Sequence, residues 1–158
     1  MTISLSDVKA ELRGDIVAIV YDEITKLCEQ TLREVINSTV YASIDTEYYT
    51  NTMQLSNVVK VEDIRQSGDS ISFLVTLKGN MLSPRQTGED EWNQHMGVKG
   101  QSFNNDTLIE ILDEGGGSSL YQHGGYGFFD KAESKLDDLL ILRLASAMRG
   151  RGWDVKMG

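Results

Sequence analysis

Residues 106 to 130 decide the fold, and they read Asp106-Thr-Leu-Ile-Glu-Ile-Leu-Asp-Glu-Gly-Gly-Gly-Ser-Ser-Leu-Tyr-Gln-His-Gly-Gly-Tyr-Gly-Phe-Phe-Asp130. The first part predicts a short helix, because its apolar residues recur at helical spacing and face inward: Leu108, Ile109, Ile111 and Leu112. Asn104, Asn105 or Asp106 caps this helix, and Gly115 ends it. Asp130 is placed to cap a longer helix that closes the chain. The stretch therefore joins two helices through a loop at residues 115 to 129.

This loop is rich in both glycine and aromatic residues, a combination that a flexible spacer does not need. Glycine lets the backbone adopt positive φ and approach another segment closely, while aromatic side chains supply large apolar contact areas. We therefore expect a docking element that lands on a surface. The predicted interface residues lie in this loop or in the one before it: Trp92, Tyr121, Tyr126, Phe128 and Phe129. One alternative stays open, in which Phe128 or Phe129 packs under the last helix as a hydrophobic staple.

The spacing of apolar residues predicts a long helix at each end of the chain. From residue 5 to residue 35 the spacing is mostly three and four, Ser4 or Ser6 can cap the start, and Asn37 and Ser38 mark the end. Gly14 lies inside this helix and indicates a local bend or a close crossing of another element. The last helix is predicted at residues 131 to 149, with a buried stripe of Ala132, Leu136, Leu139, Leu140, Leu144 and Ala147 or Met148.

A β-hairpin is predicted at residues 57 to 78, because the apolar residues of its second strand alternate strictly: Ile71, Phe73, Val75 and Leu77. One face of this strand must be covered. Trp153 and Val155 can add a short edge strand. These elements predict one α+β domain over residues 1–158, in which two long helices pack on a small, mainly antiparallel sheet with long irregular loops.

The segment at residues 79 to 103 is predicted to be an extended loop without regular structure. It holds the only proline, Pro84, and the acidic run Glu89-Asp90-Glu91. Loops of this length are usually functional. We expect this one to become ordered by contact with a neighbouring molecule.

Composition limits the classes of function. The net charge of −9 argues against a surface that grips nucleic acid, which needs clustered Lys and Arg. Cys28 is the only cysteine, which excludes an internal disulfide, and we expect it to be a small buried hydrophobe. The sequence shows no apolar run of membrane-spanning length and no secretion signal, so we expect a protein made in the cytoplasm without a membrane partner.

The sequence shows no pattern of catalytic or metal-binding chemistry. His95 and His123 have no Cys or Asp partner at ligand spacing, which argues against a zinc site. Gly115-Gly-Gly117 follows a helix and precedes no Gly-Lys-Ser/Thr, which argues against a phosphate loop. Asp137 and Asp138 point different ways on a helix and suggest no acid/base pair. We therefore predict that the protein is not an enzyme and has no catalytic residues, no metal and no cofactor.

Four short motifs accompany this order of elements: Tyr49-Thr-Asn-Thr52-Met-Gln-Leu55 before the hairpin, Met96-Gly-Val-Lys-Gly100, Leu108-Ile-Glu-Ile-Leu112, and Gly127-Phe-Phe-Asp-Lys-Ala132 at the start of the last helix. Together with the order of elements, they resemble the tail-completion or neck (head-tail joining) protein family of tailed bacteriophages. The first motif differs from the family's segment in that Asn51 replaces an arginine, and the start of the last helix lacks the family's usual proline.

The resemblance implies a structural virion protein, made in the host cytoplasm, that forms a homo-oligomeric ring of six or twelve copies in the phage neck. Its partners would be itself and the neighbouring connector and tail proteins. DNA would pass the lumen without specific binding, and an acidic lumen suits that role because like charges do not hold a duplex. Two alternatives stay open: a tail-terminator ring protein, and a monomeric intracellular module that grips a peptide with its aromatic loop.

Overall fold

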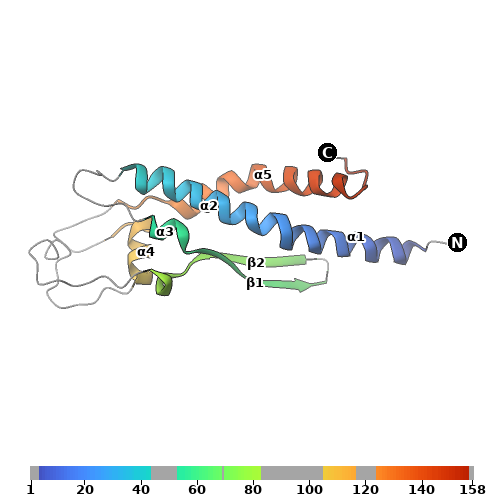
Figure 1. The fold of residues 1–158 in the computed structure, drawn as a ribbon, viewed down its shortest axis with the longest axis horizontal. Coiled ribbons are helices and arrows are strands. Elements are labelled where there is room, and N and C mark those ends of the chain that lie inside the picture. Colours follow the sequence, from blue (N-terminus) through green and yellow to red (C-terminus); the bar gives the residue numbers. More distant parts are fainter. Residues whose placement is uncertain (1–3, 44–52, 69, 83–104, 117–123, 157–158) are drawn as a thin grey trace, which may run out of the picture.

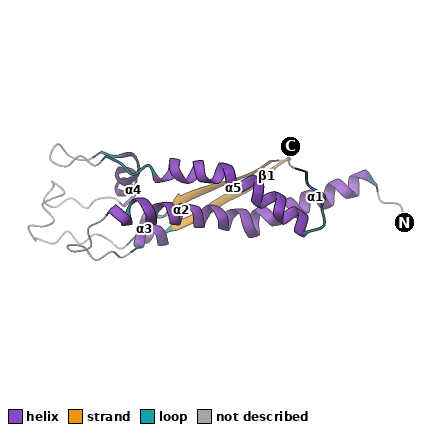
Figure 2. Cartoon of the chain, turned by 90° about the horizontal axis from the view of Figure 1, so that it is seen from above, coloured by secondary structure: helices purple, strands orange, loops and turns teal. Residues whose placement is uncertain are grey.

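The computed structural model describes residues 4–43, 53–68, 70–82, 105–116 and 124–156. The fold is α+β and elongated (Figure 1). Three helical segments follow one another without a break and form one long rod: α1 (Leu5–Ile19), the π-helical η1 (Val20–Ile24) and α2 (Thr25–Thr39). The last helix, α5 (Phe128–Gly150), runs antiparallel to this rod (Figures 1 and 2). Both helices pack on a two-stranded sheet, which confirms the predicted architecture.

The rod begins where the sequence predicts. Its irregular turn lies at η1 and not at Gly14, where the sequence analysis expected a bend or a close crossing. Ser4 caps α1 through a capping box, in which the backbone N–H of Asp7 donates to Ser4 Oγ and that of Ser4 donates to the Asp7 carboxylate. An added Cβ at Gly14 would meet nothing within 4 Å, so the predicted crossing there is wrong. The irregularity is η1, where the N–H of Thr25 donates to the carbonyl oxygen of Val20 and the Thr25 hydroxyl donates to the carbonyl oxygen of Tyr21.

The hairpin is confirmed. Strand β1 (Val59–Ser67) pairs antiparallel with β2 (Ser70–Leu77), with Val59 opposite Leu77. The register shifts between Glu62 and Arg65, which is a β-bulge, and Asp63 has a φ of 50° there. The alternating side chains of β2 turn toward the helices as predicted. Residues 153–156 are not a strand, so the predicted edge strand at Trp153 and Val155 is wrong.

Two side chains of α2 secure the outer edge of β1. Arg33 donates from Nη2 to the carbonyl oxygen of Val59, at 3.1 Å, and the N–H of Val61 donates to Glu29 Oε1, at 3.2 Å. Edge strands otherwise present unpaired backbone groups to other chains. The rod therefore holds the hairpin by hydrogen bonds as well as by apolar packing.

Three ion pairs fix the antiparallel register of α5 against the rod. Lys135 pairs with Glu34 at 4.0 Å, Arg143 with Glu23 at 3.3 Å and, just beyond the end of α5, Arg151 with Asp15 at 2.9 Å. Exposed pairs of this kind contribute little energy individually. Their regular spacing along both helices nonetheless shows that the two helices run side by side over most of their length.

The start of α5 differs from the prediction. The helix begins at Phe128 with Gly127 as its N-cap, in the left-handed region at φ 57°, because the N–H of Lys131 bonds to the Gly127 carbonyl. Asp130 lies exposed in the first turn of the helix, so it is not the cap. A carboxylate there still interacts favourably with the helix dipole.

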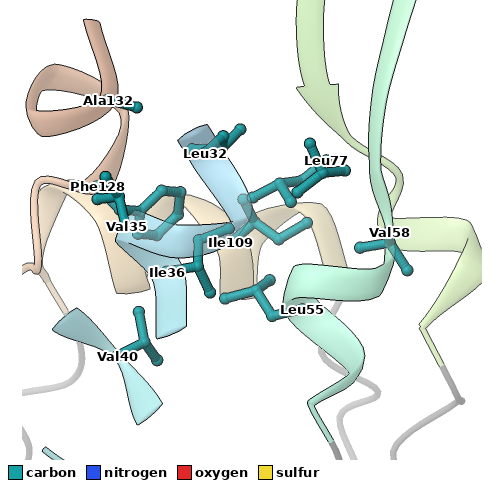
Figure 3. Close-up of a cluster of buried hydrophobic side chains, with 11 residues drawn as sticks. Leu32, Val35, Ile36, Val40, Leu55, Val58, Leu77, Ile109, Phe128 and Ala132 are labelled. Atoms are coloured by element: carbon teal, nitrogen blue, oxygen red, sulfur yellow. The ribbon is translucent and has the colours of Figure 1, made fainter. Parts of the chain in front are cut away.

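The buried side chains form two clusters along the length of the molecule. The first joins α2, α5 and the hairpin to α3 (Gln54–Asn57) and α4 (Asn105–Glu114), and it contains Phe128, Leu32, Ile36, Val59 and Leu77 (Figure 3). The second joins η1, α2 and the carboxyl-terminal half of α5, and Phe73 packs against it as predicted. Leu139 is 41% exposed, so its predicted place in the buried stripe is wrong.

Candidate interaction surface

The described end of the predicted docking element, residues 124 to 129, contacts its own chain. Three backbone N–H groups at the end of the glycine-aromatic loop and the start of α5 meet the carboxyl-terminal turn of α4. The N–H of Tyr126 donates to the Leu112 carbonyl oxygen and the N–H of Gly127 donates to the Asp113 carbonyl oxygen, both at 2.8 Å. The N–H of Phe129 donates to Asp113 Oδ1 at 3.1 Å. Because the last carbonyls of a helix lack partners inside it, this segment also completes α4.

Phe128 is not an interface residue. Its side chain is 0% exposed, and Figure 3 shows it among the aliphatic side chains of the first cluster. Of the two readings that the sequence left open, the structure supports the packing of Phe128 beneath the last helix. A residue so deeply buried cannot contact a partner without unfolding its own domain.

Tyr126 and Phe129 are half-buried and pack against the first cluster. The Phe129 ring lies 5.0 Å from that of Phe128, centroid to centroid, and the Tyr126 hydroxyl accepts a hydrogen bond from Ser43 at 2.8 Å. These two side chains therefore present only part of their surface to a partner. Trp92 and Tyr121, the remaining predicted interface residues, lie outside the described residues.

The most exposed apolar side chains of α5 were missed by the sequence analysis. Ile141 is 66% exposed and Leu142 is 52% exposed. The available signal was the run Leu139-Leu-Ile-Leu142, in which four consecutive apolar residues cover more of a helix than one buried face can use. Asp137 lies one helical turn before Ile141, and Asp138 lies one helical turn before Leu142. We call these four residues the α5 patch.

The amino-terminal half of α1 is also incompletely covered. Leu5 is 71% exposed, and α1 shows only one buried residue, Ile19. Leu12 and Ile16 separate two open hollows. One, of about 520 Å³, lies against α5 and the carboxyl-terminal tail and has Ile141 at its rim. The other, of about 300 Å³, lies between α1 and the tip of the hairpin.

The hollow beside the hairpin has an apolar floor and a cationic wall. Leu12, Ile16, Val17 and Ile71 form the floor, and among the described residues the charged ones that line the hollow are Lys9 and Arg13. Lys9 and Arg13 lie one helical turn apart, as Leu12 and Ile16 do. We call this hollow the α1 groove.

The carboxyl-terminal tail is clasped to α1 beside these hollows. Asp15 accepts from the Trp153 indole at 2.7 Å and from Arg151 at 2.9 Å. These two hydrogen bonds, the one from Trp153 first, hold the pKa of Asp15 below its ordinary value of 3.8. Arg149 in turn donates to the carbonyl oxygen of Val155. Arg149 and Arg151 therefore both help to hold the tail in place.

The described residues hold neither a metal-binding cluster nor an exposed thiol. No three His, Cys, Asp or Glu side chains there lie close enough to hold a metal ion. Cys28 is 2% exposed, and burial raises the pKa of its thiol to about 11, so the thiolate that would react is scarce at neutral pH. No helix within the described ranges has the length and apolar content to span a membrane. What this part of the chain does present is an apolar surface with charges around it.

Comparisons with models of protein families, with curated proteins and with solved structures find no match to this chain.

Proposed function

We propose that the chain is a structural virion protein that forms a homo-oligomeric ring in the neck of a tailed phage and connects the head to the tail. The observation that carries this proposal is the α5 patch, whose Ile141 and Leu142 are more than half exposed although they lie beside a well-formed core. Large exposed apolar side chains that cluster on one face mark interaction sites. The sequence resemblance supplies the kind of assembly in which such a face is covered.

The shape of the molecule supports a ring. Two long antiparallel helices present extended sides, along which copies can pack next to one another (Figure 1). A cyclic ring needs two different surfaces on each copy, so that every contact repeats until the ring closes. The net charge of −9 suits a lumen that DNA passes, because an acidic wall does not retain phosphates.

Deletion of the gene in the phage that carries it tests the proposed function. We expect electron microscopy of the lysate to show filled heads and separate tails, and we expect the gene supplied in trans to restore whole particles. Whole, infectious particles in the absence of the gene would refute the proposal. Labelled antibody then separates the neck position from the tail terminator, because a neck ring stays on isolated heads and a terminator ring stays on isolated tails.

A monomeric peptide-binding module is the second candidate, and the two hollows along α1 favour it. An apolar hollow rimmed by charges suits an amphipathic helix of another protein. The two functions differ in stoichiometry. A binding module is absent from purified particles, whereas a neck protein is present in a fixed number of copies.

A further inference from the structure

We infer that strand β2 pairs with β2 of a second copy, antiparallel and across a two-fold axis at Leu74, so that the two hairpins form one continuous sheet. The inference concerns the protein on its own and does not depend on the proposed function. Three observations carry it. The outer edge of β2 is open, the strand lacks the features that keep open edges apart, and a large apolar side chain is exposed at its middle.

The hydrogen bonds of β1 show which backbone groups of β2 face outward. The Val59 carbonyl and the Val61 N–H point away from β2, because they bond to side chains of α2. Their partners in the sheet register are Leu77 and Val75, which therefore point their own backbone groups away from β1. Alternate residues of a strand share this direction. The outward set in β2 is therefore Ile71, Phe73, Val75 and Leu77.

This outer edge of β2 is open. The sheet has two strands within the described residues, and no hydrogen bond there reaches the outward backbone groups of Ile71, Phe73 or Val75. The outer edge of β1, in contrast, is occupied by Arg33 and Glu29 at its start and interrupted by the β-bulge further along. A strand that adds to β2 needs a free edge of its own, and of the two described strands only β2 offers an uninterrupted one. The partner is therefore β2 of a second copy.

The sequence of β2 has none of the features by which proteins keep an open edge from pairing, which are charged residues, proline and bulges. The charged residues and the bulge of the hairpin are in β1, whereas β2 reads Ser70-Ile-Ser-Phe-Leu-Val-Thr-Leu77 and has no charge, no proline and no glycine. Asp69 and Lys78 flank β2 in the sequence. Antiparallel pairing brings the start of one strand to the end of the other, so these flanking residues do not place like charges together.

Leu74 sets the register of the pairing. Its side chain is 52% exposed, on the face of the sheet opposite to Phe73 and Val75, which pack against the second cluster. A two-fold axis at Leu74 places it directly opposite its copy, in a close pair that exchanges no hydrogen bonds. Phe73 then exchanges hydrogen bonds with Val75 of the second copy, and Ile71 with Leu77 of the second copy. The pairing thus covers Leu74 and satisfies the open edge.

Disulfide formation through one introduced cysteine tests the inference. Leu74→Cys in a Cys28→Ala background places two thiols opposite each other across the axis. Their Cα atoms would lie about 4.5 Å apart, within the range of about 4.4 to 6.8 Å that a disulfide spans. We expect mild oxidation to convert most of the purified protein to a covalent dimer. Ser72→Cys in the same background is the matched control, because it is exposed on the same face but would lie about 14 Å from its copy, and it should give no dimer.

A charge at the same position tests the pairing without a crosslink. Sedimentation of the unmodified protein at millimolar concentration should show species no smaller than a dimer. Leu74→Lys should weaken this association roughly tenfold or more, because it places like charges face to face, and mixing it with Leu74→Glu should restore the dimer. Leu142→Lys is the matched control, since Leu142 is also 52% exposed but lies on α5, and it should leave the association unchanged.

Three results would each overturn the inference: a monomer at millimolar concentration, equal oxidation of the Leu74→Cys and Ser72→Cys proteins, and a dimer that Leu74→Lys does not weaken. Thermal melting verifies that each variant is folded. All samples are purified protein, so the outcome is independent of the particle experiments that test the neck function.

Discussion

At the scale of single residues, Phe128 and Leu139 are two apolar side chains of one helix that differ in burial. Phe128 is fully buried against α2 and α4, whereas Leu139 lies 41% exposed between Lys135 and Arg143, which reach across to the rod. The hydrophobic contribution of a side chain follows the apolar area that it removes from water. Stability should therefore depend far more on Phe128 than on Leu139.

We predict that Phe128→Ala lowers the free energy of unfolding by about 3 to 5 kcal/mol, because the substitution leaves a cavity in the core. Leu139→Ala, the matched control on the same helix, should cost less than about 1 kcal/mol, as changes at exposed sites do. Urea unfolding followed by circular dichroism measures both. Equal losses in the two variants would show that the buried face of α5 is assigned wrongly.

The sequence could not separate these two residues. Its periodicity places Leu139 in line with Leu136 and Leu140, and the run at residues 139–142 is apolar on nearly every side. Which part of such a run is buried depends on where α5 meets the rod, and the partners on the rod are distant in sequence. The sequence did leave open the burial of Phe128 or Phe129, because a bulky residue at a helix start commonly packs beneath its helix.

At the scale of elements, the junction of α4 with α5 depends on one glycine. Gly125 has a φ of 66°, and an added Cβ would lie 2.6 Å from the Glu114 carbonyl carbon and 2.7 Å from the Asp113 carbonyl oxygen. Only a residue without a side chain allows the loop to approach the end of α4 so closely. The glycines that suggested a docking loop thus serve an intramolecular contact at this position.

We predict that Gly125→Ala lowers stability by about 2 kcal/mol or more, because the new methyl group meets backbone atoms and the residue must keep a positive φ. Gly124→Ala is the matched control, since an added Cβ there meets nothing within 4 Å. Its stability should stay within about 0.5 kcal/mol of the parent. If thermal melting finds both variants alike, the close approach of loop and helix is refuted.

The hydrogen bonds that Trp153 and Arg151 donate to Asp15 predict that the attachment of the carboxyl-terminal tail depends on pH. Because the folded pKa of Asp15 is lowered, the stabilisation by its carboxylate is complete above the ordinary value of 3.8 and is lost as pH falls through the lower folded value. We expect the Trp153 emission, measured in a Trp92→Phe background, to stay constant from neutral pH down to about 3.8 and to shift to longer wavelength below it.

Asp15→Asn is the control for this titration. Its amide can still accept from the indole but carries no charge, so the acid-dependent shift of the Trp153 emission should disappear. Circular dichroism on the same samples separates release of the tail from general unfolding. An emission shift well above pH 3.8 in the parent would contradict the assigned hydrogen bonds.

At the scale of the whole molecule, local sequence patterns predicted the helices and strands. Contacts between residues distant in sequence determine which of their side chains are buried. The rod, the hairpin, α4 and α5 follow from periodicity, alternation and turn residues. The start of α5 contacts Asp113 and the Trp153 indole contacts Asp15, and both partners lie far away in the sequence, where no local pattern indicates them. The α1 groove was equally unpredictable, because it lies between segments separated by about fifty residues of sequence.

The number of copies in purified phage particles tests the central claim most directly. Quantitative mass spectrometry of particles of the phage that carries this gene gives that number relative to the other virion proteins. A closed ring of identical subunits predicts a fixed multiple, six or twelve copies in each particle. Absence of the chain from the particles, or a single copy in each, would contradict the account.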